Sequence, residues 1–133
     1  MRYFMKVAAM PKTDIVIYQN KNGSVPLLEW FDDLSQKAVD KCIVKIELLE
    51  ESGYDLRRPH CDLLEEGIYE LRAKLKRVNY RILYFFEGKN AVIVSHGCTK
   101  EKKVPKSEIN KAIRHRNNYI QNPRAHTYKG ALR

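Results

Sequence analysis

The stretch GIYELRAKLKRVNYRILYFFEGKNAVIVSHGCTKEKK, residues 67–103, decides the fold because it contains three consecutive strand patterns. In the first, apolar and charged residues alternate, which is typical of a half-buried strand. The charged positions are Glu70, Arg72 and Lys74. The second and third strands are expected at 80–86 and 91–96. The stretch therefore predicts an antiparallel meander.

Basic side chains gather on one face of this meander. We expect the hairpin to close at Leu75 and Tyr80, so that Lys74 lies opposite Arg81 on the face that also carries Arg72. Like charges directly opposite each other destabilise a sheet. This pattern leads to the hypothesis that the face holds an anion.

The charge of the chain is uneven. Its 133 residues carry 25 Lys and Arg against 16 Asp and Glu, a formal net charge of +9. Residues 1–66 hold 9 basic and 12 acidic side chains, whereas residues 67–133 hold 16 basic and 4 acidic. The basic half comprises the meander and the segments after it. This charge favours a polyanionic partner such as nucleic acid, and the alternative is that it serves only solubility.

Several classes of protein find no support in the sequence. Three cysteines without CxxC or Cys/His spacing predict neither a disulfide framework nor a zinc site, so we expect a reducing, cytoplasmic location. No apolar run approaches the ~18 residues of a membrane span, and the first residues lack a signal-peptide core. HExxH, GxSxG and phosphate-binding glycine loops are missing from the sequence. We expect no metal, no cofactor and no membrane partner.

The remaining segments complete an α+β domain. A strand is expected at 14–19, and two amphipathic helices come next, the first with Ser24 as N-cap and the second over 35–52. The last helix is expected at 106–121. The order β-α-α-β-β-β-α predicts a small, mostly antiparallel four-stranded sheet with two N-terminal helices and one C-terminal helix. We assign 1–13 to an extension, 14–121 to a single domain, and 122–133 to a basic, mobile tail, with 54–66 as a loop.

Four other residues are candidates for functional groups. His60, beside two arginines in the loop, could contact RNA, but a surface position is favoured. His96 is favoured as a structural histidine over a general base, with Ser95 on the opposite sheet face. Tyr84 shares its face with apolar residues and is assigned to the core. Nothing in the sequence pairs Cys98 with a His and an Asp or Asn that would make it a nucleophile.

The cations of the meander suit RNA cleavage without a metal. That reaction needs the 2′-OH deprotonated or aligned, the charge at phosphorus stabilised, and the leaving oxygen protonated. Arginine binds phosphate oxygens bidentately, and a lysine crowded by other cations has a lowered pKa that suits it to proton transfer.

The same residues resemble a known family. The elements GIYELR (67–72), YRILYFF (80–86), Ser-His-Gly (95–97) and KKVPKSEINKAIRHR (102–116) are similar to the phage-derived HigB-like branch of the RelE/ParE toxin superfamily. The likeness covers roughly residues 14–121. It implies the toxin of a type II toxin–antitoxin pair, typically a ribosome-dependent mRNA endonuclease neutralised by a small helix-turn-helix antitoxin of the HigA type.

The resemblance also assigns roles to residues. Arg72 and Arg81 are expected to hold the scissile phosphate, and Lys100 to be the catalytic cation of the loop after the third strand. The residues expected to bind RNA are Lys74, Lys76, Arg77, Lys102 and Lys103. The loop departs from the family pattern Gly-Phe-x-Lys-Lys, since Cys98 and Glu101 replace the Phe and the second Lys and the loop is one residue shorter. A carboxylate there weakens the local field, and Lys102 or Lys103 is the candidate substitute.

Two other functions stay open. A ParE-like toxin of the same fold would poison a protein target such as DNA gyrase without cleaving RNA. A catalytically silent module would bind nucleic acid or an antitoxin only. The fold alone does not choose among the three.

Overall fold

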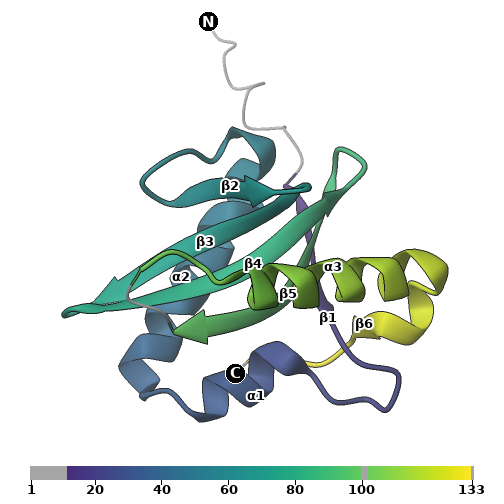
Figure 1. Cartoon of the computed structure of the whole chain (residues 1–133), viewed down its shortest axis with the longest axis horizontal. Helices are drawn as coiled ribbons and strands as arrows, with labels where there is room; N and C mark the ends of the chain where they lie inside the picture. The colour runs from purple at the N-terminus through teal and green to yellow at the C-terminus, as the bar shows by residue number, and fades with distance from the viewer. Residues whose placement is uncertain (1–11, 100–101, 133) are drawn as a thin grey trace, which may run out of the picture.

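The structure is a computed structural model that describes residues 12–99 and 102–132 (Figure 1). The helices are α1 (Pro26–Asp32), α2 (Gln36–Ser52) and α3 (Lys106–Gln121), with short 3-10 turns η2 (Gly53–Asp55) and η3 (Arg124–His126). The strands are β1 (Asp14–Tyr18), β2 (Cys61–Glu65), β3 (Ile68–Leu75), β4 (Val78–Glu87), β5 (Ala91–Thr99) and β6 (Thr127–Tyr128). The α+β class is confirmed. The predicted extension 1–13 falls almost wholly outside the described residues.

The sheet has six strands in the order β2-β3-β4-β5-β1-β6, so the prediction of four was wrong. All neighbouring strands are antiparallel except β1 and β5, which are parallel. β2 lies in the predicted loop 54–66, and β6 lies in the segment predicted as a tail. Both escaped prediction because β2 is rich in acidic residues and β6 has only two residues, so each depends on pairing with a neighbour.

The β3–β4 hairpin is tighter than the sequence predicted. Leu75 pairs with Val78 rather than Tyr80, leaving a two-residue turn in which Lys76 has a φ of 58°. This register places Arg72 directly opposite Arg81, instead of pairing Arg81 with Lys74. The prediction of a shared basic face was right, but its cross-strand pairs were wrong.

Helices cover both faces of the sheet. α1 and α2 pack against the face that carries Leu71, Ile82 and Tyr84, and α3 packs against the face that carries Leu83 and Phe85. Leu71 and Ile82 are fully buried, which is worth about 2 kcal/mol each. Tyr84 is 1% exposed, as its assignment to the core predicted.

The sequence predicted the ends of α2 correctly but not the start of α1. Ser35 Oγ accepts a hydrogen bond from the backbone N–H of Ala38, and Gly53, with a φ of 52°, comes directly after the last turn of α2. The prediction of Ser24 as the N-cap of α1 was wrong, because Ser24 Oγ donates to Asn22 Oδ1 and α1 has no side-chain cap. None of the helices among the described residues is long and apolar enough to cross a bilayer.

A β-bulge in β5 changes where its side chains point. Leu83 pairs with His96 but the next residue, Tyr84, pairs with Val94, so Ser95 is an extra residue in the ladder. Alternation along a regular strand would place Ser95 and His96 on opposite faces. Instead both contact α3, since Ser95 Oγ lies 2.7 Å from His115 Nδ1 and His96 Nε2 lies 2.9 Å from Glu108 Oε1.

Candidate functional site

Arg72 and Arg81 come together across the β3–β4 ladder because the tight hairpin makes them direct partners. Both donate to Glu70. Arg81 Nη1 lies 2.6 Å from Oε1, and Arg72 Nε and Nη2 lie 3.0 and 2.9 Å from Oε2. Glu70 precedes Arg72 by two residues in β3, so both side chains project from the same face.

A second carboxylate extends the row of charges to β2. Asp62 Oδ2 accepts from Arg72 Nη2 at 3.1 Å and from Arg58 Nη2 at 2.8 Å. The hydrogen bond from Arg58 holds the pKa of Asp62 below its usual value. We call Arg58, Asp62, Arg72, Glu70 and Arg81 the arginine cluster, in which basic and acidic side chains alternate from the turn before β2 across β2, β3 and β4.

Glu70 offsets the repulsion that is expected between the basic side chains of this sheet face. Two guanidinium groups opposite each other repel, but the carboxylate of Glu70, which is 3% exposed, lies between them and neutralises one charge. Arg81 is largely buried at 11% exposure of its side chain, whereas Arg72 is 36% exposed. Nη1 of Arg72 has no hydrogen-bond acceptor among the described residues, so this arginine has a donor to offer to an anion.

The other predicted site residues are more dispersed. Lys74 is exposed opposite Asn79, and Lys76 and Arg77 form the exposed hairpin turn. Lys102 and Lys103 are exposed in the segment that leads to α3. Lys103 lines a small cavity with Glu65 and Lys106, at the end of β2. Lys100 and Glu101 lie outside the described residues.

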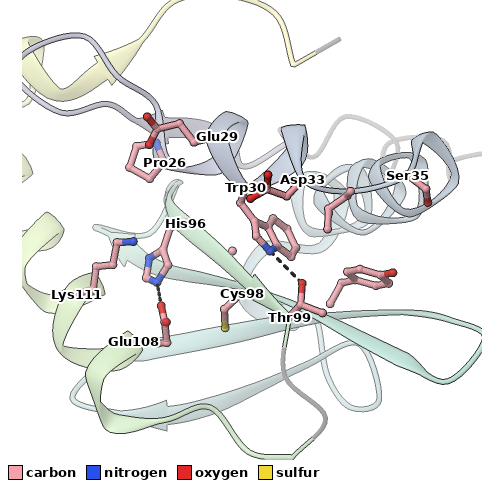
Figure 2. A pocket seen from close by; sticks show the side chains of 13 residues that line it. Pro26, Glu29, Trp30, Asp33, Ser35, His96, Cys98, Thr99, Glu108 and Lys111 are labelled. Carbon is pink, nitrogen blue, oxygen red and sulfur yellow. Dashed lines mark hydrogen bonds and ion pairs between the residues drawn. The ribbon is translucent and has the colours of Figure 1, made fainter.

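A cleft of about 660 Å³ lies between α1, the end of β5 and α3 (Figure 2). Trp30 projects into it and donates from Nε1 to Thr99 Oγ1 at 3.1 Å. The charged residues of its lining are Glu29, Asp33, Glu108 and Lys111, together with His96. Carboxylates outnumber the lysine three to one, so the cleft repels phosphate. Of the two sites, the arginine cluster is the better candidate for binding an anion.

His96 lines this cleft but both of its ring nitrogens are occupied. Nε2 lies 2.9 Å from Glu108 Oε1 and Nδ1 lies 2.8 Å from Ser95 Oγ, which in turn lies 2.7 Å from His115 Nδ1. Burial lowers the pKa of both histidines to about 3, so both are neutral at neutral pH. A neutral His96 then donates from Nε2 to Glu108 and accepts from the Ser95 hydroxyl, while Nδ1 of His115 donates to Ser95. This arrangement is that of a structural histidine.

Two further candidates, His60 and Cys98, have a partner or are buried. His60 Nδ1 lies 2.9 Å from Lys45 Nζ and the residue is partly buried. Cys98 is buried, at 6% exposure. Among the described residues, no three His, Cys, Asp or Glu side chains are grouped so that they could hold a metal ion.

Sequence reasoning missed the two acidic members of the cluster. The alternation along the strand predicts only that Glu70 lies on its polar face, and the sequence predicts a loop at Asp62. The signal for Glu70 was present in its spacing, since Glu70 and Arg72 two residues apart in a strand share a face. The signal for Asp62 depends on the pairing of β2 with β3, which aligns Asp62 with Glu70.

Most of the chain matches a known protein family. The family described as "Phage derived protein Gp49-like (DUF891)" matches residues 29–117. The matched range runs from α1 into α3 and includes β2 to β5, so the whole arginine cluster lies inside it. No curated protein matches the chain significantly.

Proposed function

Because the chain belongs to the family of phage-derived Gp49-like proteins, which is of the RelE/HigB-like toxin type, we propose that it is the toxin of a type II toxin–antitoxin pair and cleaves messenger RNA. Its expected partners are a helix-turn-helix antitoxin, the transcript and the ribosome. Family membership supports a toxin in general terms. Nuclease activity is a more specific proposal than a toxin in general, and it is argued from the arginine cluster.

The observation that carries the proposal is the pairing of Arg72 with Arg81 on one sheet face. A phosphodiester under attack by its own 2′-OH gathers negative charge on the phosphoryl oxygens. Arg72 offers Nη1 to those oxygens, and Arg81, held beside it, adds a fixed positive charge. One such preorganised contact lowers the barrier by about 3 kcal/mol.

Proton transfer needs a further group near this face. The proposal gives this role to Lys100, which comes directly after β5 in the sequence. The backbone of Cys98 pairs with that of Arg81 in the sheet, and β5 ends one residue later, at Thr99, which directly precedes Lys100 in the sequence. Lys74, Lys76 and Arg77 at the hairpin, with Lys102 and Lys103, would contact flanking phosphates of the RNA.

One observation favours the non-nucleolytic alternative. Asp62 and Glu70 neutralise two of the three arginine charges, which leaves the cluster only one unit positive. A ParE-like toxin that binds a protein target, or a silent binding module, needs no surplus of charge at this point.

The deciding experiment is to map transcript 5′ ends after brief induction. We expect wild type to create new ends within coding regions and to arrest growth, and Arg72→Ala to do neither. Arg72 is the better variant because Arg81 and Arg58 remain to pair with Glu70 and Asp62, so the fold is preserved. Arg114→Ala, which removes an exposed arginine of α3, is the matched control and should behave as wild type.

The result also separates the alternatives. Growth arrest with intact transcripts would contradict the nuclease and favour a protein target. The absence of both arrest and cleavage would favour the silent module.

A further inference from the structure

Glu70 joins the two arginines through separate oxygens. Arg81 takes Oε1 and Arg72 takes Oε2, with the latter contact made through two N–H groups. A simple ion pair would engage one arginine. Here a single carboxylate, rigidly buried at 3% exposure, sets the position of one guanidinium relative to the other.

We propose that Glu70 is the positioning residue of an anion site formed by the arginine cluster. It acts through Arg72 and Arg81 rather than on the RNA. This inference rests on the proposed nuclease function. Its basis is that an arginine left alone has several rotamers, and ordering it at the moment of binding costs conformational entropy. Glu70 orders both side chains in advance, in the way that preorganised sites require.

The same carboxylate also opposes anion binding, because its negative charge cancels one positive charge of the pair. Removing the charge of Glu70 while keeping the shape of the side chain therefore raises the affinity for RNA but lowers the rate of cleavage. RNA binds more tightly because the site is one unit more positive. Cleavage slows because Glu70 no longer fixes the two guanidinium groups relative to each other, and they repel each other. A residue with a purely structural role would weaken both.

The experiment compares three variants of the full chain. Glu70→Gln keeps the size of the side chain and removes the charge. Glu70→Asp keeps the charge but shortens the side chain, so that it cannot reach both arginines. Glu51→Gln, an exposed position at the end of α2 that pairs with Lys12, makes the same change in net charge away from the cluster.

Two measurements are needed. The first is the affinity of a fluorescein-labelled single-stranded RNA as a function of salt. We expect Glu70→Gln to bind more tightly than wild type and to steepen the slope of log K against log salt by about 0.7, the value for one further phosphate charge neutralised on a single strand. Glu70→Asp and Glu51→Gln should not steepen it.

The second measurement is the rate of cleavage of a transcript on programmed ribosomes. A displacement of about 1 Å at a reacting centre costs about 100-fold in rate, so we expect kcat to fall by that order in both Glu70 variants. KM should fall in Glu70→Gln alone. Thermal unfolding of each variant identifies the temperature range in which it is folded, and both assays are done inside that range.

The outcomes separate this inference from the function on which it rests. If wild type cleaves and folded Glu70→Gln retains its kcat, positioning by Glu70 is overturned and the nuclease stands. If wild type does not cleave RNA, the proposed nuclease function is wrong, and only the RNA-binding measurement tests the role of Glu70. A steeper slope of log K against log salt for Glu70→Gln than for Glu51→Gln then supports the control of anion binding by Glu70. Weaker RNA binding by folded Glu70→Gln overturns the inference in either case.

Discussion

Arg72 lies directly opposite Arg81 in the β3–β4 ladder, and both donate to the single carboxylate of Glu70. Two like charges are thus held side by side by a third, opposite charge of the same sheet face. The pair is a stable part of the fold before any ligand is bound, and its energetics can be measured without RNA.

The contact between Glu70 and Arg81 is expected to be strongly coupled. Removing either partner takes a charge-assisted hydrogen bond away from a buried charge, so Glu70→Gln and Arg81→Gln should each lower the free energy of unfolding by about 2 kcal/mol. The double variant should lose less than the sum of the two, with a coupling of about 2 kcal/mol. Urea unfolding of the four proteins measures it. Strict additivity would contradict the observed ion pair.

The buried histidines make stability depend on pH. Burial lowers the pKa of His96 and His115 to about 3 in the folded state, against about 6.5 in the unfolded chain. The unfolded state therefore binds more protons between these values, and stability falls as pH decreases through this window. We expect a loss on the order of 2 kcal/mol for each of the two histidines between about pH 7.5 and pH 5.

The matched variants for this prediction are His115→Gln and Asn117→Ala. The first removes one of the titrating groups, so its urea midpoint should change less with pH than that of wild type. The second alters an exposed residue of the same helix that does not titrate, and it should retain the wild-type dependence. Equal dependence in all three proteins would show that these histidines do not control acid stability.

A side chain at Gly97 is incompatible with the position of Trp30. A Cβ added at Gly97 would lie 2.1 Å from Trp30 Cε3, so Gly97→Ala must displace the indole. We expect a loss of about 2 kcal/mol, as for other overpacked sites. Trp30 is the only tryptophan in the sequence, and its emission should shift to longer wavelength as it moves toward water.

The matched test replaces both partners. In a Trp30→Leu background, which removes the ring, Gly97→Ala should cost much less than it does in wild type. An equal cost in both backgrounds would trace the effect to the backbone of β5 instead.

The C-terminal segment is expected to stabilise the domain. His126 is 8% exposed, stacks on Tyr18 at 5.2 Å between ring centroids, and has Nδ1 2.9 Å from the carbonyl oxygen of Gln19. Ending the chain after Asn122 removes these contacts together with β6, and should cost at least about 2 kcal/mol. Ending it after Tyr128 keeps them and should cost less. Thermal unfolding of the two truncated chains tests this order.

Local patterns predicted most of the fold. Alternation in β3, the apolar stripe of α2 with its Ser35 and Gly53 ends, and the segment of α3 needed no knowledge of distant residues. β2 and β6 could not be predicted, because neither has a strong strand pattern and each is defined by its partner. The bulge at Ser95 likewise exists only in relation to β4.

The candidate site was predicted only in part, because some of its features depend on pairing between strands. The face shared by Arg72 and Arg81 is a consequence of alternation along each strand, but their direct pairing depends on a turn two residues shorter than expected. Glu70 belongs to the site only once that pairing is known, since its two oxygens then meet two arginines. Lys100 and Glu101, on which the comparison of loops depended, lie outside the described residues.

The position of β1 has a consequence for how the chain is made. This first strand lies between β5 and β6, so its two neighbours come from residues 91–94 and 127–128. The hairpins from β2 to β5 join segments close in sequence and close quickly, whereas β1 must wait for partners far along the chain. During synthesis, therefore, the sheet is completed only after residues 127–128 have left the ribosome, long after β1 has done so.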